Sequence, residues 1–373
     1  MSALISFEKR KQPPLDVWLS SDTHDLGGAP GDVFLMAAYL AAWRAGERSI
    51  DIDYPVDPLV VANLSVVARI IGLWDRRSGP PPAINAATSA TFSTNRGVGL
   101  FLSGGVDSVA SLSTLTKSYP PEHPRRPTHS ILIDYQAINR MSEQEAEARY
   151  SGRRRICETL SGSAGVDLIA LRTNLRLLDD SGKFWAERWH GAVLASVAHA
   201  VSNHIGTVNI GSTKTWDTLE PWGSHPALDP LYSGRSVQTQ HHGFEMSRMD
   251  KIRSIVDWQD ALDLINVCTS RESGGTNCGS CEKCLRTRVQ LLACGALANA
   301  GAFAGSEVDP SELRNTIAPN RYSLQCFTDA LEPLRQMGRH DLVDAIEHFV
   351  DRSERDNAFK RLLRKISKRL PVR

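Results

Sequence analysis

Short apolar segments alternate with helical segments between residues 96 and 300, and this alternation constrains the fold more than any other feature of the sequence. The apolar segments are predicted strands at 98–102, 130–134, 167–171 and 207–211. The segments between them are predicted helices at 107–116, 142–160 and 190–205. Strands that alternate with helices in this way favour an α/β fold, in which helices cover both faces of a doubly wound parallel sheet of Rossmann-like type. Ligands of such sheets bind at the carboxyl ends of the strands.

Two segments flank this region. Residues 1–95 are predicted to form a small N-terminal α/β domain for packing or recognition, because they contain no motif of reactive residues. The Gly- and Pro-rich stretch 76–82 cannot continue a helix and is typical of a linker. Residues 301–373 are predicted to form a helical C-terminal extension, so the expected domains are 1–95, 96–300 and 301–373.

Charge is unevenly distributed along the chain. The formal net charge of +1 argues against a whole surface that binds polyanions, but residues 352–373 alone carry +7. Apolar residues recur there at helical spacing, so residues 357–370 are predicted to form a basic amphipathic helix. Such a helix fits an acidic protein, an RNA or a membrane surface, or it packs on its own domain.

We expect a cytoplasmic protein, because no apolar run suits a bilayer and the N-terminus lacks a signal-peptide core.

The turn after the first of these strands has the sequence Ser103-Gly104-Gly105-Val106-Asp107-Ser108. Its two glycines allow the backbone to turn tightly and to bring N–H groups close to a ligand, and the positive end of the following helix points to the same place. The hydroxyl groups of Ser103 and Ser108 add donors, and Asp107 is suited to hold Mg²⁺ or to orient the loop. We therefore expect a phosphate-binding loop, although the turn lacks the Gly-Lys-Ser/Thr of a Walker A sequence.

Four of the seven cysteines follow the spacing C-x9-C-x2-C-x2-C. They are Cys268, Cys278, Cys281 and Cys284. Four thiolates can surround one ion, and a tetrahedral Zn²⁺ site within a knuckle at 268–284 is the expected result. The alternatives are an iron–sulfur cluster, which four cysteines can also hold, and a redox-active pair, which would use only two of them. Cys157, Cys294 and Cys326 are expected to be buried packing thiols.

The glycine-rich turn and the cysteine cluster together resemble one family. The sequence from Ser103 to Ser108, after an apolar strand, is similar to the PP-loop of ATP pyrophosphatases, the adenine-nucleotide alpha-hydrolase-like enzymes. With the segment from Val267 to Cys284, it resembles the 7-cyano-7-deazaguanine synthases, or QueC-like proteins. The resemblance covers about residues 96–295, and it implies ATP as a cofactor beside Mg²⁺ and Zn²⁺.

The resemblance also implies a reaction. Enzymes of this kind cleave ATP between its α and β phosphates, place AMP on a carboxylate or amide oxygen, and release pyrophosphate. A nitrogen nucleophile, from ammonia or an amine, then displaces AMP. The expected substrate is a small-molecule carboxylate or heterocycle of the 7-deazaguanine type, and QueC-like proteins in phage-defence operons make a partner protein another candidate acceptor. Two alternatives stay open: a sulfurtransferase that thiolates a nucleobase or small molecule, and a non-catalytic module that senses ATP.

Residues after the second and fourth predicted strands match the family's nucleotide site. Asp134 and Tyr135, followed by Gln136, resemble a family sequence Asp-Tyr-Gly-Gln whose strand end lies by the adenine. Gly211 and Ser212 occupy a place that borders the nucleotide in relatives. The sequence departs from the family pattern near Ala137, where a glycine is expected, and residues 1–95 have no counterpart in the compact enzymes.

Other polar residues are candidates for substrate binding and catalysis. Arg188 and His190 lie where the family has an Arg-Asn pair, and they are expected to contact substrate together with Arg248. Lys214 is a candidate cation for the charge that develops on phosphate. The expected catalytic residues are Ser103, Asp107, Ser108 and Lys214. A homodimer is a further expectation.

Overall fold

The computed structural model describes residues 1–76, 79–89, 97–136, 142–268, 276–316 and 320–367, with side chains up to Arg355. The chain divides into two compact units, Met1–Glu245 and Met246–Arg373. The position predicted for a family glycine, Ala137, lies outside the described residues.

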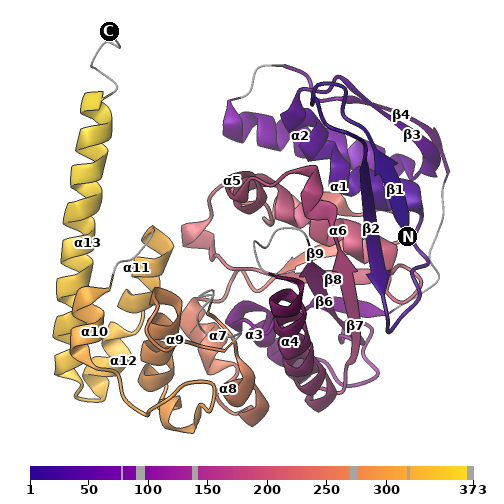
Figure 1. Cartoon of the computed structure of the whole chain (residues 1–373). Helices are drawn as coiled ribbons and strands as arrows, with labels where there is room; N and C mark the ends of the chain where they lie inside the picture. Colours follow the sequence, from indigo (N-terminus) through magenta and orange to yellow (C-terminus); the bar gives the residue numbers. More distant parts are fainter. Residues whose placement is uncertain (77–78, 90–96, 137–141, 269–275, 317–319, 368–373) are drawn as a thin grey trace. The chain divides into compact units, whose positions relative to one another are not determined.

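The first unit is built on a sheet that has seven strands among the described residues, in the order β1-β2-β7-β6-β5-β8-β9 (Figure 1). Their bounds are β1 (Ser2–Ile5), β2 (Leu15–Ser21), β5 (Val98–Phe101), β6 (His129–Tyr135), β7 (Asp167–Thr173), β8 (Thr207–Gly211) and β9 (Gln238–His242). The strands from β7 to β9 are parallel, whereas β1 and β2 add an antiparallel pair beside β7. The predicted α/β fold class and the mostly parallel sheet are therefore confirmed.

The order of the parallel strands places a topological switch between β5 and β8. The chain runs from β5 through β6 to β7 in one direction, and then returns across the sheet to β8 and β9. Because such crossovers are right-handed, the helices of the two halves lie on opposite faces. The first half contains α3 (Val106–Ser118) and α4 (Glu143–Ser163), and the second contains α6 (His190–Ala200). This order is compatible with a Rossmann-like fold.

The N-terminal 95 residues are continuous with this sheet. β2 pairs with β7, and α1 (Pro30–Ala45) packs against α6. Every residue of α1 from Gly31 to Trp43 is buried. A helix that is apolar all round has to be surrounded by other elements, and the rest of a small separate domain is not enough to surround it. A parallel pair, β3 (Ser49–Val56) and β4 (Ala83–Thr88), lies outside the main sheet. The contacts thus divide the chain after Glu245, whereas the sequence predicted boundaries after 95 and 300.

Helix α2 (Pro58–Asp75) is, among the described residues, the one helix long and apolar enough to cross a membrane by length and composition, with a mean hydropathy of 1.4. One face of this helix packs in the core of the first unit. Its buried residues are Val60, Leu64, Val67, Ala68 and Ile71. With 28% of its residues buried, α2 has one face in the core, and its length and composition alone are weak evidence for a membrane span.

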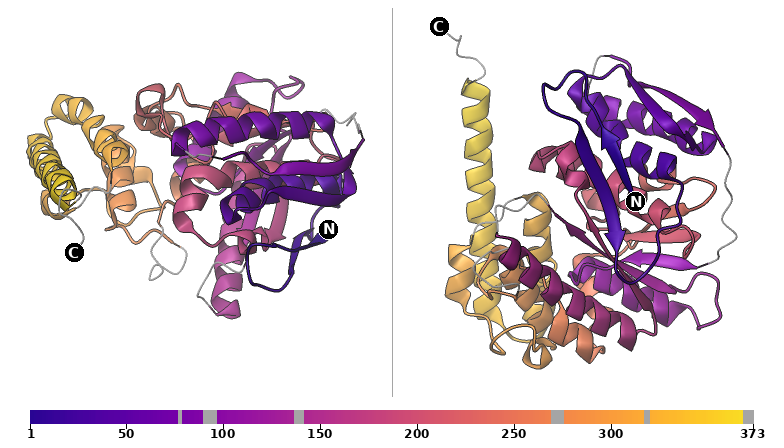
Figure 2. Two further views of the ribbon diagram at one scale, coloured as in Figure 1. Left: turned by 90° about the horizontal axis from the view of Figure 1, so that it is seen from above. Right: turned by 45° about the vertical axis from the view of Figure 1, so that its right-hand side comes forward.

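The second unit is helical in its described residues. Its helices are α7 (Arg248–Arg253), α8 (Gln259–Leu264), α9 (Glu282–Ala293), α10 (Pro310–Asn315), α11 (Arg321–Thr328), α12 (Leu331–Gln336) and α13 (His340–Ser367). In both views of Figure 2, α13 (yellow) is one continuous helix. The predicted basic segment is therefore helical over 357–367, its last positions 368–370 lie outside the described residues, and its docking to a partner stays a prediction.

A buried tryptophan links the N-terminal segment to the helices of the first unit. The Trp189 indole N–H donates to the backbone carbonyl of Ala37 on α1 at 2.8 Å. We expect Trp189→Phe to lower the free energy of unfolding by about 1–3 kcal/mol, because it removes this buried hydrogen bond and leaves space where the larger ring was. Trp216→Phe, at a side chain that is 63% exposed, is the matched control and should change stability by less than about 0.5 kcal/mol. Urea denaturation followed by circular dichroism measures both, and equal stabilities would contradict this link.

Candidate functional site

The turn from Ser103 to Ser108 connects the carboxyl end of β5 to α3, and it is folded by its own hydrogen bonds. Gly104 has a φ of 79°, in the left-handed region that favours glycine. The backbone N–H of Ser103 donates to Ser108 Oγ at 3.2 Å, and Ser108 Oγ donates to the Gly105 carbonyl at 3.0 Å. Because Gly105 is the N-cap and has no side chain, the positive end of α3 is left open to an anion.

A cavity of about 250 Å³ lies beside this turn, at the carboxyl ends of β5, β6 and β8. Several residues that the sequence predicted line it together: Ser103, Asp107, Ser108, Tyr135, His190 and Gly211. Phe101, Ile131 and Ile210 add apolar walls from the three strands. The cavity lies at the switch point between β5 and β8, which is where sheets of this kind bind their ligands.

Gly211 lets the end of β8 approach the start of α3. A Cβ atom on Gly211 would lie 3.1 Å from the Asp107 carbonyl oxygen and 3.0 Å from Ser111 Oγ. Ser111 Oγ also donates to that carbonyl at 3.0 Å, so the crowded atoms are fixed. Any side chain at position 211 would therefore push β8 away from the turn.

Gly104, Gly105 and Val106 of the turn do not line the cavity themselves, and neither do three predicted residues outside the turn. Asp134 ends β6 beside Tyr135, and burial raises the pKa of its carboxyl group. Ser212 is buried and its hydroxyl donates to the Lys214 carbonyl at 2.7 Å. The Lys214 ammonium is paired with Glu220 and lies 5.2 Å from the ring centroid of Trp222, a residue of the cavity wall. The Trp222 ring thus contacts both Lys214 and the cavity, and Lys214 itself does not line the cavity.

The three residues predicted to contact substrate, Arg188, His190 and Arg248, have three different sets of neighbours. His190 lines the cavity, and burial lowers the pKa of its imidazole, so the ring is neutral. Its Nδ1 meets the Trp185 carbonyl at 3.0 Å, and since a carbonyl only accepts, Nδ1 carries the proton. Arg188 instead binds Asp75 of α2, at 2.6 and 2.8 Å. Arg248 belongs to the second unit, where it is buried and donates to Thr287 Oγ1 at 3.5 Å.

Sequence reasoning missed Arg153, whose side chain lines the cavity from α4. The turn itself contains no lysine or arginine. The Arg153 guanidinium therefore supplies the positive charge that an anion in the cavity would contact. The run of three arginines at 153–155 was the available signal. The neighbouring Arg154 instead pairs with Asp22 and Glu158, so the run alone does not identify the residue that faces the cavity.

A buried Ser–Asp–His group behind the cavity wall was also missed. Ser224 lines the cavity and donates to Asp229 Oδ2 at 2.6 Å, and His241 Nδ1 meets the same oxygen at 2.7 Å. In a Ser–His–Asp triad the serine and the aspartate use opposite ring nitrogens, but here both lie at Nδ1. The group therefore holds Ser224 in place and does not activate it as a nucleophile.

The predicted cysteine cluster is formed in the second unit. Cys268 Sγ lies 3.8 Å from Cys281 Sγ, and Cys278 Sγ lies 3.9 Å from Cys284 Sγ. A tetrahedral site with Zn–S bonds of about 2.3 Å separates its sulfur atoms by about 3.8 Å, so these two pairs already have the spacing of a zinc site, and all four Sγ atoms lie within 4.8 Å of one another. Although burial opposes it, hydrogen bonds from the backbone N–H groups of Cys281 and Ser280 lower the pKa of Cys278 to about 6. The four cysteines thus form a site that could bind a metal such as zinc, as predicted.

Comparisons with known proteins add nothing to these residues. The sequence matches no protein-family model, and neither the curated proteins nor the solved structures contain a match to the chain. The function therefore has to be inferred from the chemistry of the cavity and of the cysteine cluster.

The cysteine cluster can be tested through the metal content of the chain. We expect Cys281→Ser to lower the zinc content of the purified protein by about one ion per chain, because a structural zinc site needs all four ligands. Cys294→Ser is the matched control, since that thiol lies outside the cluster, and it should leave the zinc content unchanged. Elemental analysis by mass spectrometry measures both. Iron with acid-labile sulfide in the wild-type protein would instead identify an iron–sulfur cluster.

Proposed function

We propose that the first unit is a PP-loop ATP pyrophosphatase domain, and that the chain is a QueC-like ATP-dependent ligase. The observation that supports this most is the turn from Ser103 to Ser108, which places an open helix N-terminus at the topological switch, beside a cavity. The fit of the four cysteines to zinc is a second point of agreement with the resemblance in sequence.

The residues of the cavity suggest how the substrates are held. The backbone N–H groups at the start of α3 and the hydroxyls of Ser103 and Ser108 would bind the pyrophosphate part of ATP. Arg153 would offset the negative charge that develops on the phosphates during transfer. Asp107 is the residue that would hold Mg²⁺, which supplies further charge neutralisation when bound. Because ligand sites usually measure about 300–1,000 Å³, the cavity of about 250 Å³ would enclose part of the nucleotide or a small acceptor.

The proposed reaction has two steps. An oxygen of the acceptor carboxylate or amide attacks the α-phosphorus of ATP, the bond to the β-phosphate oxygen breaks, and pyrophosphate leaves. Ammonia or an amine then attacks the activated carbon, the bond from this carbon to the AMP oxygen breaks, and the nitrogen loses a proton. His190 is suited to accept that proton, because its imidazole is neutral and lines the cavity. A heterocyclic carboxylate of the 7-deazaguanine type is the proposed acceptor.

The burial of the remaining cysteines favours nitrogen over sulfur as the nucleophile. A sulfurtransferase needs an accessible thiolate to carry sulfur. Burial raises the pKa of Cys157 to about 12, and its thiol donates to the Leu102 carbonyl at 3.5 Å. Burial also raises the pKa of Cys326, and partial burial raises that of Cys294, which is half-buried and not fully buried as the sequence predicted. All three are therefore protonated near neutral pH, and we place the ligase ahead of sulfur transfer.

The cysteine cluster and the proposed reaction also suggest the compartment and the partners of the protein. Four thiols close enough to bind one metal require a reducing compartment, so we propose that the protein works in the cytoplasm. Its proposed partners are the small-molecule acceptor and the nitrogen donor. A protein or RNA bound by the basic segment 357–370 that the sequence predicted to be helical, and a second copy of the chain, are further candidates.

Nucleotide binding tests the proposed role of the turn. We expect Ser103→Ala combined with Asp107→Ala to weaken binding of a non-hydrolysable ATP analogue with Mg²⁺ by at least about tenfold, because it removes a phosphate donor and the proposed magnesium ligand. Ser118→Ala, at the exposed far end of α3, is the matched control and should bind normally. Isothermal titration calorimetry measures all three proteins, and equal affinities would rule out this role.

The products of ATP turnover test the reaction. We expect AMP and pyrophosphate in equal amounts when the protein is incubated with ATP, Mg²⁺, ammonia and 7-deazaguanine carboxylic acids. Arg153→Gln should slow their formation by about tenfold or more, because it removes the cation of the cavity. Chromatography of the nucleotides separates the outcomes. ADP and phosphate as sole products would contradict the proposed cleavage, and ATP binding without any products would favour the sensing alternative.

A further inference from the structure

A second group of potential metal ligands lies in the first unit, at the amino ends of the parallel strands. Ring nitrogens of His24, His129 and His204 lie within 4.8 Å of one another. His129 is the first residue of β6, His204 lies between α6 and β8, and His24 follows β2. The cavity described above lies at the carboxyl ends of these strands, so the three histidines are separate from it.

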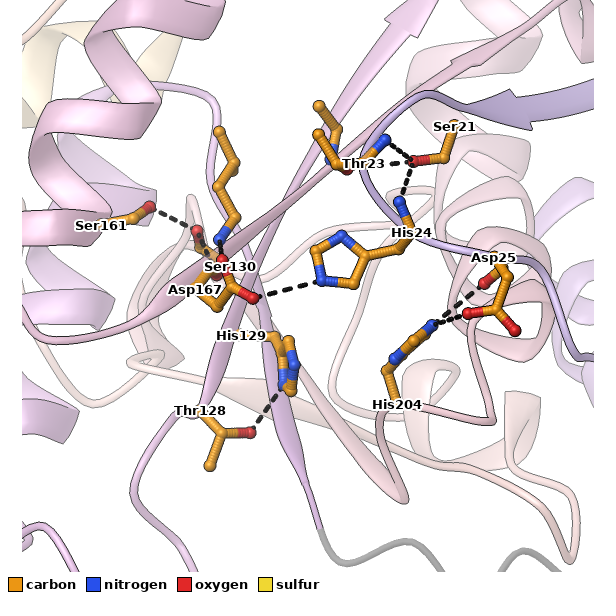
Figure 3. Close-up of polar contacts among 12 residues, drawn as sticks. Ser21, Thr23, His24, Asp25, Thr128, His129, Ser130, Ser161, Asp167 and His204 are labelled. Carbon is orange, nitrogen blue, oxygen red and sulfur yellow. Dashed lines mark hydrogen bonds and ion pairs between the residues drawn. The ribbon is translucent and has the colours of Figure 1, made fainter.

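The three imidazoles share one space and do not stack on one another, as Figure 3 shows. The ring centroids of His24 and His204 are 4.9 Å apart at an interplanar angle of 87°, and those of His24 and His129 are 6.0 Å apart at 80°. Zinc with Zn–N bonds of about 2.0–2.1 Å in a tetrahedral site separates its nitrogen ligands by about 3.3 Å. Small side-chain rotations therefore suffice to bring the three nitrogens to bonding distance.

Oxygen atoms surround the three rings in the way that metal-bound histidines require. Asp167 Oδ2 lies 3.2 Å from His24 Nε2, and Asp25 Oδ1 lies 3.0 Å from His204 Nε2 (Figure 3). Such carboxylates orient a ligand ring and offset the charge of a bound cation. His24 also has a buried Nδ1 without a hydrogen-bond partner among the described residues. An unpaired buried nitrogen is costly, and a metal ion would satisfy it.

We propose that His24, His129 and His204 bind a divalent transition-metal ion, with Zn²⁺ as the expected occupant. Neutral imidazole prefers zinc and its transition-metal neighbours, whereas Mg²⁺ and Ca²⁺ prefer oxygen ligands. Three histidines leave a fourth position, which water can take. The ion would fasten the segment after β2 to β6 and to the connection between α6 and β8. This site does not depend on the proposed ligase activity.

Zinc content separates this site from the cysteine cluster. We expect about two zinc ions per chain in the wild-type protein, about one in His24→Gln combined with His204→Gln, and about one in Cys281→Ser. All three changes together should leave none. His123→Gln is the matched control, because this histidine stacks on Tyr119 outside the cluster, and it should retain two. An unchanged zinc content in the double histidine variant would overturn the proposal.

A stability measurement keeps the proposal testable if the double variant folds poorly. In Cys281→Ser protein the cysteine cluster is disabled, so ZnCl₂ added after a chelator has stripped the protein of metal should raise the melting temperature through the histidines alone. Adding the single change His129→Gln should abolish that rise. An equal rise in both proteins, or none in either, would show that the three histidines do not bind zinc. The contacts of His24 with Asp167 and of His204 with Asp25 would then be ordinary hydrogen bonds.

Discussion

The strand order, in which the chain moves from β5 to one edge of the sheet and then returns to add β8 on the other side of β5, is the constraint on which the first unit depends. Since the crossovers leave these two strands toward opposite sides, α4 and α6 cover opposite faces, and the crevice between the strand ends stays open. Arg153 of α4 and His190 of α6 reach this one cavity from the two faces. The close approach of Gly211 to the Asp107 carbonyl holds the crevice narrow. Residues far apart in sequence thus share one site because of strand order.

The same geometry gives the two ends of the parallel strands opposite electrostatic character. Helices of a parallel sheet begin at the carboxyl ends of the strands and finish at the amino ends. Their positive ends therefore gather beside the cavity, as for α3, and favour anions. Their negative ends gather at the other side, where His204 follows α6 and Asp167 follows α4, and favour cations. The proposed phosphate site at one end and the proposed metal site at the other agree with this polarity.

The sequence predicted the local parts of this structure and missed the parts that depend on distant contacts. β5, β6 and β7 are recognisable because buried parallel strands are continuous apolar runs. β9 has the polar sequence Gln-Thr-Gln-His-His at the sheet edge and gives no such signal. The turn and the cysteine cluster are contiguous motifs, so their residues were found. The pairing of Arg188 with Asp75 could not be predicted, because Asp75 lies 113 positions away in the sequence, and the contact of Arg188 with substrate stays a prediction.

The carboxylate in the turn shapes how the proposed nucleotide site selects its ligand. Asp107 lies in the first turn of α3, where the positive helix end stabilises its negative charge. A bare polyphosphate would compete with this carboxylate for the same positive end and would be repelled by it. A divalent cation carried by the nucleotide converts the repulsion into attraction, because it binds carboxylate and phosphate oxygens alike. We therefore expect the proposed site, with an aspartate and no lysine in its turn, to select metal-bound nucleotides, and Arg153 of α4 to supply the remaining positive charge.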